Sequence, residues 1–286
     1  MHIKADLLPA AKLLNSFLAQ TVLYWNENDE TPALNSQAAQ EIGSFSRRES
    51  VATAYTQAGM LFESAADYSM ALVKAFTLPA TAIAPWGITR NVLEMSALAT
   101  WLWDTKIYAF QRVQRSLIFW HKGLIDELKL AKISKGFLDP KKVVARINYV
   151  EHIALELGMG NVENKKGRKQ FVFKMEMPTN TEIVSSILNK EQEYRLLSAM
   201  VHGRNWAIQS LGFELLKEDQ MIFDGVKGGH LEKHLSYSSV NYLCTSAFTS
   251  LASTILMKFK LFGWNARPIG TIIKRTQNEL AKLHDE

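Results

Sequence analysis

Cysteine is nearly absent from this chain of 286 residues, which contains only Cys244. A single thiol excludes a disulfide framework within the chain and any zinc module built from several cysteines. Such sparse use of cysteine is typical of the reducing cytoplasm, where we expect this protein to reside. Hydrophobic residues make up 47% of the sequence and charged residues 21%, a balance that indicates a globular protein.

Long apolar runs and a strong excess of one charge are also missing. Residues 240–257 come closest to a membrane span, but serine, threonine and asparagine interrupt them and Lys258 and Lys260 follow. Residues 1–18 lack the features of a signal peptide. We therefore expect a soluble protein with no membrane partner. The net charge of +5 allows contact with RNA without requiring it.

The sequence has none of the common nucleotide-binding or hydrolase motifs. It contains no GxGxxG, no GxxxxGK[ST] loop and no GxSxG elbow, so dehydrogenase, P-loop and α/β-hydrolase functions have no support. His230 and His234 are four residues apart, but zinc needs at least three protein ligands and the HExxH order is absent. We expect no metal site and no cofactor, and a zinc hydrolase is only a third interpretation.

Helical periodicity dominates the remaining sequence. Apolar residues recur every three or four positions in most of the chain, which predicts an all-α bundle of about eight helices in a single domain, 1–286. The first helix, 3–26, has Pro9 in its first turn and is a candidate arm. Residues 86–104 are apolar nearly all round and predict a buried central helix. The other expected helices are 50–78, 106–132, 141–157, 181–188, 190–209, 230–262 and 269–283.

Two segments depart from the helical pattern. Residues 27–49 and 161–177 are polar or basic and predict connections. The stretches LGFELL and MIFDGV flank a polar turn, and they predict a small β-hairpin near 211–226.

Residues 194–206, YRLLSAMVHGRNW, carry a polar line along an otherwise apolar helix. Arg195 and His202 are seven residues apart, so two helical turns return them to one face about 10 Å apart. Ser198 lies between them and Asn205 follows one turn later. An unpaired buried polar group costs on the order of 1–3 kcal/mol, so the line is either a structural lock or a functional site.

An arginine and a histidine on one face can perform phosphodiester chemistry without a metal ion. The guanidinium can hold phosphate oxygens through parallel donors. An imidazole can exchange a proton with a ribose hydroxyl or a leaving oxygen. The pair of Arg195 and His202 fits this chemistry, with Ser198 and Asn205 as supporting groups.

This part of the chain resembles the HEPN superfamily of helical nucleotide-binding and RNA-cleaving domains. Its members carry an arginine and, a few residues later, a histidine on one helix; here six residues separate Arg195 from His202. The central helix TRNVLEMSALATWLWD and the following RVQR are similar to those of an uncharacterised bacterial branch of the superfamily. The resemblance covers about residues 85–210. This sequence departs from the family pattern at Leu196, where active members commonly have a polar residue.

The resemblance implies a metal-independent endoribonuclease of the toxin or phage-defence type that acts as a homodimer on RNA. Arg195 would bind phosphate, and His202 would serve the attacking 2′-hydroxyl or the leaving group. The alternative is a non-catalytic helical module that binds a partner, in which the polar line locks helices together. Leu196 and the apolar character of the helix favour this alternative.

Charged residues on other helices are further candidates. Arg90 and Glu94 are four apart in the central helix; they form either an internal ion pair or a support in which Glu94 orients His202 or Arg195. Arg112 and Arg115 are either a phosphate-binding fork or a solvated face. A basic cluster interleaved with phenylalanines is a candidate for binding single-stranded nucleic acid, although a solvated loop is the commoner explanation of such a pattern. It consists of Lys165, Lys166, Arg168 and Lys169 with the nearby Lys174.

Overall fold

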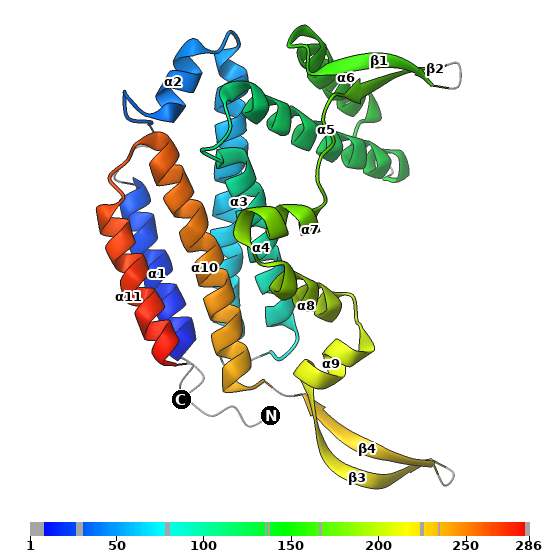
Figure 1. Cartoon of the computed structure of the whole chain (residues 1–286). Helices are drawn as coiled ribbons and strands as arrows, with labels where there is room; N and C mark the ends of the chain where they lie inside the picture. Colours follow the sequence, from blue (N-terminus) through cyan, green and yellow to red (C-terminus); the bar gives the residue numbers. More distant parts are fainter. Residues whose placement is uncertain are drawn as a thin grey trace.

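The computed structural model describes residues 9–26, 31–77, 81–134, 136, 138–165, 168–223, 226–233 and 235–283, without the side chains of 22–26, 165, 168–169, 214–223 and 226–233. Helices dominate these residues, which confirms the all-α prediction (Figure 1). The long helices are α1 (Pro9–Asn26), α3 (Arg48–Ala75), α4 (Ala84–Trp103), α5 (Ala109–Ile133), α6 (Pro140–Glu156), α8 (Glu191–Val201), α10 (Tyr237–Phe262) and α11 (Arg267–Lys282). The short ones are α2 (Gln37–Ser44), α7 (Asn180–Ile183), which continues into a π-helical turn (Val184–Leu188), and α9 (Asn205–Gly212).

Helix α4 lies at the centre of the bundle, as its apolar sequence predicts. It packs against α3 on one side and α10 on another (Figure 1). Val92, Leu93 and Leu102, which lie on different sides of the helix, are each 0% exposed. The side chains that α4 shares with its neighbours form one connected core that reaches from α1 to α11.

Helix α1 is part of this bundle and not the arm that the sequence suggested. Its described part runs from Pro9 to Asn26 and lies alongside α10 and α11 (Figure 1). Its apolar stripe is buried, with Leu14 and Phe17 at most 1% exposed. Phe17 meets Phe248 of α10 edge to face, at 4.9 Å between ring centroids.

Helix α10 is the one described helix that is long and apolar enough to cross a membrane by length and composition. About two thirds of its apolar window is buried inside the protein. Its hydroxyl groups bond to backbone within the bundle: Thr254 Oγ1 donates to the carbonyls of Ser96 and Ser250. These features are those of a helix in the core of a bundle.

Two β-hairpins extend from the helices (Figure 1). Strands β3 (Phe213–Phe223) and β4 (Val226–Lys233) form a hairpin in the region where the sequence predicts one. Its pairing differs from the prediction, because the expected turn at 217–220 lies inside β3 and most of the two stretches expected to pair belongs to that one strand. Strands β1 (Gly160–Lys165) and β2 (Arg168–Phe173) form a second hairpin where a loop was expected. There, a Cβ added to Gly160 would lie only 2.4 Å from the Phe171 ring, so glycine permits this close pairing.

Several helix boundaries differ from the sequence expectation. The expected connection 27–49 contains α2, whose N-cap Ser36 accepts a hydrogen bond from the backbone N–H of Ala39. The expected helix 230–262 begins only at Tyr237, where Ser236 caps it, and His230 belongs to β4. The expected helix 190–209 breaks at Gly203, whose φ of +65° is the left-handed conformation that commonly ends a helix.

Candidate functional site

Helices α4 and α8 are joined by a polar cluster that we call the Arg90 cluster, made of Arg90, Glu94, Tyr194 and Ser198. Arg90 pairs with Glu94 at 2.7 Å and donates to Ser198 Oγ at 3.0 Å and to the Tyr194 hydroxyl at 3.1 Å. The Tyr194 hydroxyl in turn donates to Glu94. Burial, together with this hydrogen bond, raises the pKa of Tyr194. The cluster therefore fixes α8 to the central helix.

The Arg90 cluster corrects two sequence expectations. Glu94 does not orient Arg195 or His202, because its carboxylate is occupied by Arg90 and Tyr194. Ser198 faces α4 and accepts from Arg90, so the hydrogen bond formed by its side chain joins the two helices. The structural lock is thus built from Tyr194 and Ser198, while the two expected catalytic residues stand outside it.

Arg195 and His202 both lie on the exposed side of α8. The Arg195 side chain is 67% exposed and pairs with Glu191 one turn earlier at 2.8 Å. The hydrogen bond from Arg195 is the main cause that lowers the pKa of Glu191. His202 is exposed, and within the described part of the chain its imidazole has no hydrogen bond or ion pair.

The backbone brings these two residues to the same side of α8. His202 is the C-cap residue, and its backbone N–H still donates to the Ser198 carbonyl at 2.9 Å. The helical path therefore continues as far as His202, and seven residues make two turns and a rise of about 10 Å. Asn205 does not extend this line, because it follows the Gly203 turn and begins α9.

Arg112 is a structural residue and not a phosphate-binding one. Its side chain is fully buried, pairs with Glu41 at 2.7 Å and donates to the backbone carbonyls of Leu102 and Asp104. Arg115 donates to the Trp101 carbonyl at 2.6 Å, and its guanidinium lies 5.0 Å from the centre of the Trp101 ring. The expected fork is not formed, since neither guanidinium is free to hold a phosphate.

The basic cluster expected in a loop lies at the end of the β1–β2 hairpin. Lys165 pairs with Arg168 in the strand register, next to Asn164 and Lys169. Lys166 lies outside the described residues, as do the side chains of Lys165, Arg168 and Lys169.

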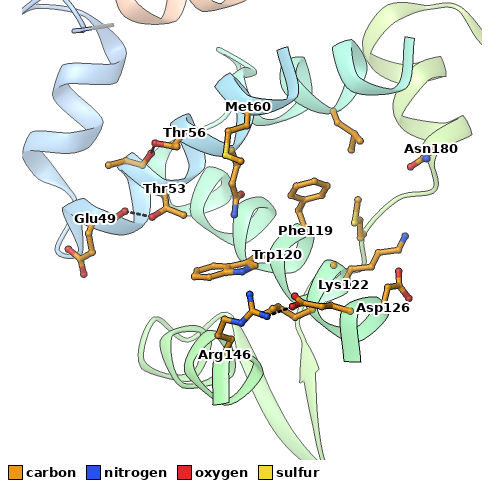
Figure 2. Close-up of a pocket in the computed structure, with 17 residues that line it drawn as sticks. Glu49, Thr53, Thr56, Met60, Phe119, Trp120, Lys122, Asp126, Arg146 and Asn180 are labelled. Atoms are coloured by element: carbon orange, nitrogen blue, oxygen red, sulfur yellow. Dashed lines mark hydrogen bonds and ion pairs between the residues drawn. The ribbon is translucent and has the colours of Figure 1, made fainter. Parts of the chain in front are cut away.

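A large cleft in the described structure was not expected from the sequence. It has a volume of about 1030 Å³ and lies between α3, α5, α6 and the segment before α7 (Figure 2). Met60 of α3, Phe119 and Trp120 of α5, and Met177 give it an apolar lining, and Arg146 of α6 pairs with Glu127 at its edge. No sequence signal marks this cleft, because its residues come from the amphipathic faces of separate helices.

Histidines form no metal-binding group in the described residues. No set of three or more His, Cys, Asp or Glu side chains that could hold a metal ion occurs there. His230 is in a strand, so the expected helical pair with His234 is not formed, and His234 itself lies outside the described residues. His121 instead bonds to Glu151 at 3.0 Å and packs against Phe173.

Comparison with models of known protein families, with curated proteins and with solved structures gave no match.

Proposed function

We propose that the exposed face of α8 is an RNA-cleaving site that works without a metal ion, in a cytoplasmic HEPN-like protein of the toxin or phage-defence type. One observation carries the proposal: Arg195 and His202 are exposed on the same side of α8, and His202 has no partner among the described residues. Because the Arg90 cluster already anchors α8, neither side chain is needed to hold the helix in place.

The proposed chemistry is transesterification within the RNA strand. The ribose 2′-oxygen attacks the adjacent phosphorus, the bond from phosphorus to the 5′-oxygen breaks, and a proton moves from the attacking to the leaving oxygen through protein groups. The imidazole of His202 suits one of these proton transfers. Arg195 suits the phosphate, because a guanidinium can hold two of its oxygens at once.

This chemistry favours a homodimer. The reaction needs a group that accepts the proton of the 2′-hydroxyl and another that donates a proton to the leaving oxygen. One chain offers a single histidine on this face of α8. Two copies with their α8 faces together would supply two imidazoles and two guanidiniums, so we propose that the active form is a dimer.

RNA degradation in EDTA by the purified protein tests the proposal. We expect cleavage by the wild type, and a rate about 10²–10⁴-fold lower for His202→Ala, the usual contribution of a positioned acid or base. Arg195→Ala should lower the rate as well. The matched controls are His152→Ala and Arg267→Ala, which remove an exposed histidine and an exposed arginine from α6 and α11.

Two results would reject the nuclease. The first is a wild-type protein that leaves RNA intact in EDTA. The second is cleavage that persists at the wild-type rate in His202→Ala. The controls identify a contaminating nuclease, because its activity would be the same in all four variants as in the wild type.

The cleft between α3, α5 and α6 favours a second candidate function, a non-catalytic binding module. Its volume of about 1030 Å³ lies at the upper end for small-molecule sites, and apolar walls with a few polar groups are usual in such sites. Gln57 supplies one polar group: its amide oxygen accepts from Ser116 at 2.8 Å, which leaves the amide N–H groups available. The occupant that fits is an amphipathic small molecule with an apolar body.

Binding of the apolar dye ANS tests this second function. The folded wild type should bind the dye, and Trp120→Ala should weaken that binding severalfold because the indole forms part of the cleft wall. Phe110→Ala is the matched control, since this ring is exposed on α5 and does not line the cleft. Equal dye binding by wild type and Trp120→Ala would reject the cleft as a site.

A further inference from the structure

The connection between α8 and α9 presents three side chains without partners. His202, Arg204 and Trp206 are all exposed, and none forms a hydrogen bond, ion pair or ring contact within the described residues. Trp206 is 57% exposed, whereas the core tryptophans Trp86 and Trp103 are at most 2% exposed. Core packing therefore does not explain this indole.

The backbone of this connection is well fixed. The N–H of Gly203 donates to the Met200 carbonyl at 3.2 Å, and the N–H of Arg204 donates to the Ala199 carbonyl at 2.9 Å. Gly203 has a φ of +65°, which a residue with a side chain would adopt only with strain. On the far side of the turn Ala207 is fully buried, which holds α9 against the bundle. The three side chains are thus presented from an ordered turn.

The chain segment that contains Trp206 carries charge of one sign. Residues 194–213 contain Arg195 and Arg204 but no aspartate or glutamate. An exposed aromatic ring beside an unpaired cation such as Arg204 is the combination that binds single-stranded nucleic acid, since the ring stacks on a base and the cation contacts a phosphate.

We infer that Trp206 is a base-stacking platform for single-stranded RNA, with Arg204 on the adjoining phosphate, next to the face that carries Arg195 and His202. This inference rests on the proposed nuclease and defines its substrate class as unpaired RNA. Trp206 lies only four residues beyond His202, so their Cα atoms are at most about 14 Å apart and one short RNA strand can contact both side chains. Double-stranded RNA, whose bases are stacked inside the helix, would not use this platform.

Binding of an uncleavable RNA separates this inference from the nuclease. The probe is a fluorescein-labelled oligouridine with 2′-fluoro groups, measured by fluorescence anisotropy in EDTA. We expect Trp206→Ala to weaken binding about tenfold, the usual contribution of one stacked base, and Trp206→Phe to retain most of the affinity. Phe110→Ala, which removes an exposed aromatic from α5, is the matched control and should bind as the wild type does.

An oligomer with abasic sites identifies stacking as the cause. Without bases, wild type and Trp206→Ala should bind equally, through phosphate contacts alone. Equal affinity of wild type and Trp206→Ala for the full oligouridine would overturn the inference. The inference would also be overturned if Trp206→Ala lost as much affinity for the abasic oligomer as for the full one. A change in the oligomeric state of Trp206→Ala, measured by light scattering, would overturn it too, because either result would assign Trp206 to another role. If Trp206 controls binding but natural RNA stays uncut, the nuclease fails and the platform stands.

Discussion

Two regions of the molecule contain the same combination of side chains with different consequences. In the Arg90 cluster an arginine pairs with Glu94, and Tyr194 donates its hydroxyl to that glutamate. The second region, which we call the Arg112 cluster, joins Arg112, Glu41 and Tyr55 in the same way. Each guanidinium also lies over its tyrosine ring, at 5.4 Å for Arg90 and 5.3 Å for Arg112.

The two clusters differ in burial and in where the remaining donors go. Arg112 is fully buried, and its other N–H groups bond to carbonyls at the end of α4, which have no partner within the helix. The Arg90 side chain is 20% exposed, and its remaining donor reaches Ser198 on another helix. The Arg112 cluster closes a helix end inside the core, whereas the Arg90 cluster fixes α8 and leaves its outer face free.

The largest expected effect follows removal of the buried arginine. Arg112→Met would leave the Glu41 carboxylate and several carbonyls buried without partners, and we expect the free energy of unfolding to fall by about 3–5 kcal/mol. Arg90→Met should cost less, about 1–3 kcal/mol, because water can reach part of the cluster. Urea unfolding of both variants measures the difference.

The exposed Arg267 provides the control for these substitutions. Arg267→Met should change the free energy of unfolding by less than about 0.5 kcal/mol. The comparison of the clusters would break down if Arg112→Met and Arg90→Met destabilised the protein equally. If Arg112→Met does not fold, Glu41→Gln provides a milder test, since it keeps the shape of the side chain and removes only its charge.

An alkaline pH series probes the tyrosines of both clusters. Burial is the main cause that raises the pKa of Tyr55 and of Tyr194. Unfolded tyrosine loses its proton near pH 10, so above about that pH the folded state binds more protons and stability falls as pH rises. The contribution is complete below about pH 10 and is lost as pH rises through the folded pKa.

Substitution by phenylalanine should reduce this dependence on pH. Tyr55→Phe removes a group that loses its proton only on unfolding, so the slope should fall by up to about 1.4 kcal/mol per pH unit. Tyr194→Phe should reduce the slope in the same direction. Urea unfolding from about pH 9 to 12 measures both, with Tyr149→Phe, a half-exposed tyrosine on α6, as control. Identical slopes in wild type and Tyr55→Phe would contradict the explanation.

Much of the fold could be predicted because its helices carry their own periodic signals. The apolar stretch around Leu93 predicted a buried central helix, and a hairpin was predicted in the right region, although its turn was expected at 217–220, which lies inside β3. The β1–β2 hairpin was missed because its basic sequence is equally typical of a loop. Helix α2 was missed because only its Ser36 cap and the packing of Ala38 define so short an element.

The candidate site was harder to predict, since spacing along a helix does not say which side is buried. Ser198 and His202 are four residues apart and were expected to act together, yet Ser198 bonds to α4 and His202 faces solvent. Arg112 was treated as a surface group because no local pattern shows that Glu41, far away in the sequence, pairs with it. The cleft beside Trp120 arises only when four segments pack together.

The smallest expected effect comes from Ser198, one of the two α8 residues in the Arg90 cluster. Ser198→Ala removes one hydrogen bond from Arg90 Nε, and we expect a loss of about 0.5–1.5 kcal/mol in urea unfolding. Ser198→Thr keeps the hydroxyl and should recover part of this stability. In the Arg90→Met background the effect of Ser198→Ala should shrink, because its partner is already gone. An undiminished effect would show that Ser198 stabilises α8 by another route and that the cluster does not act as a unit.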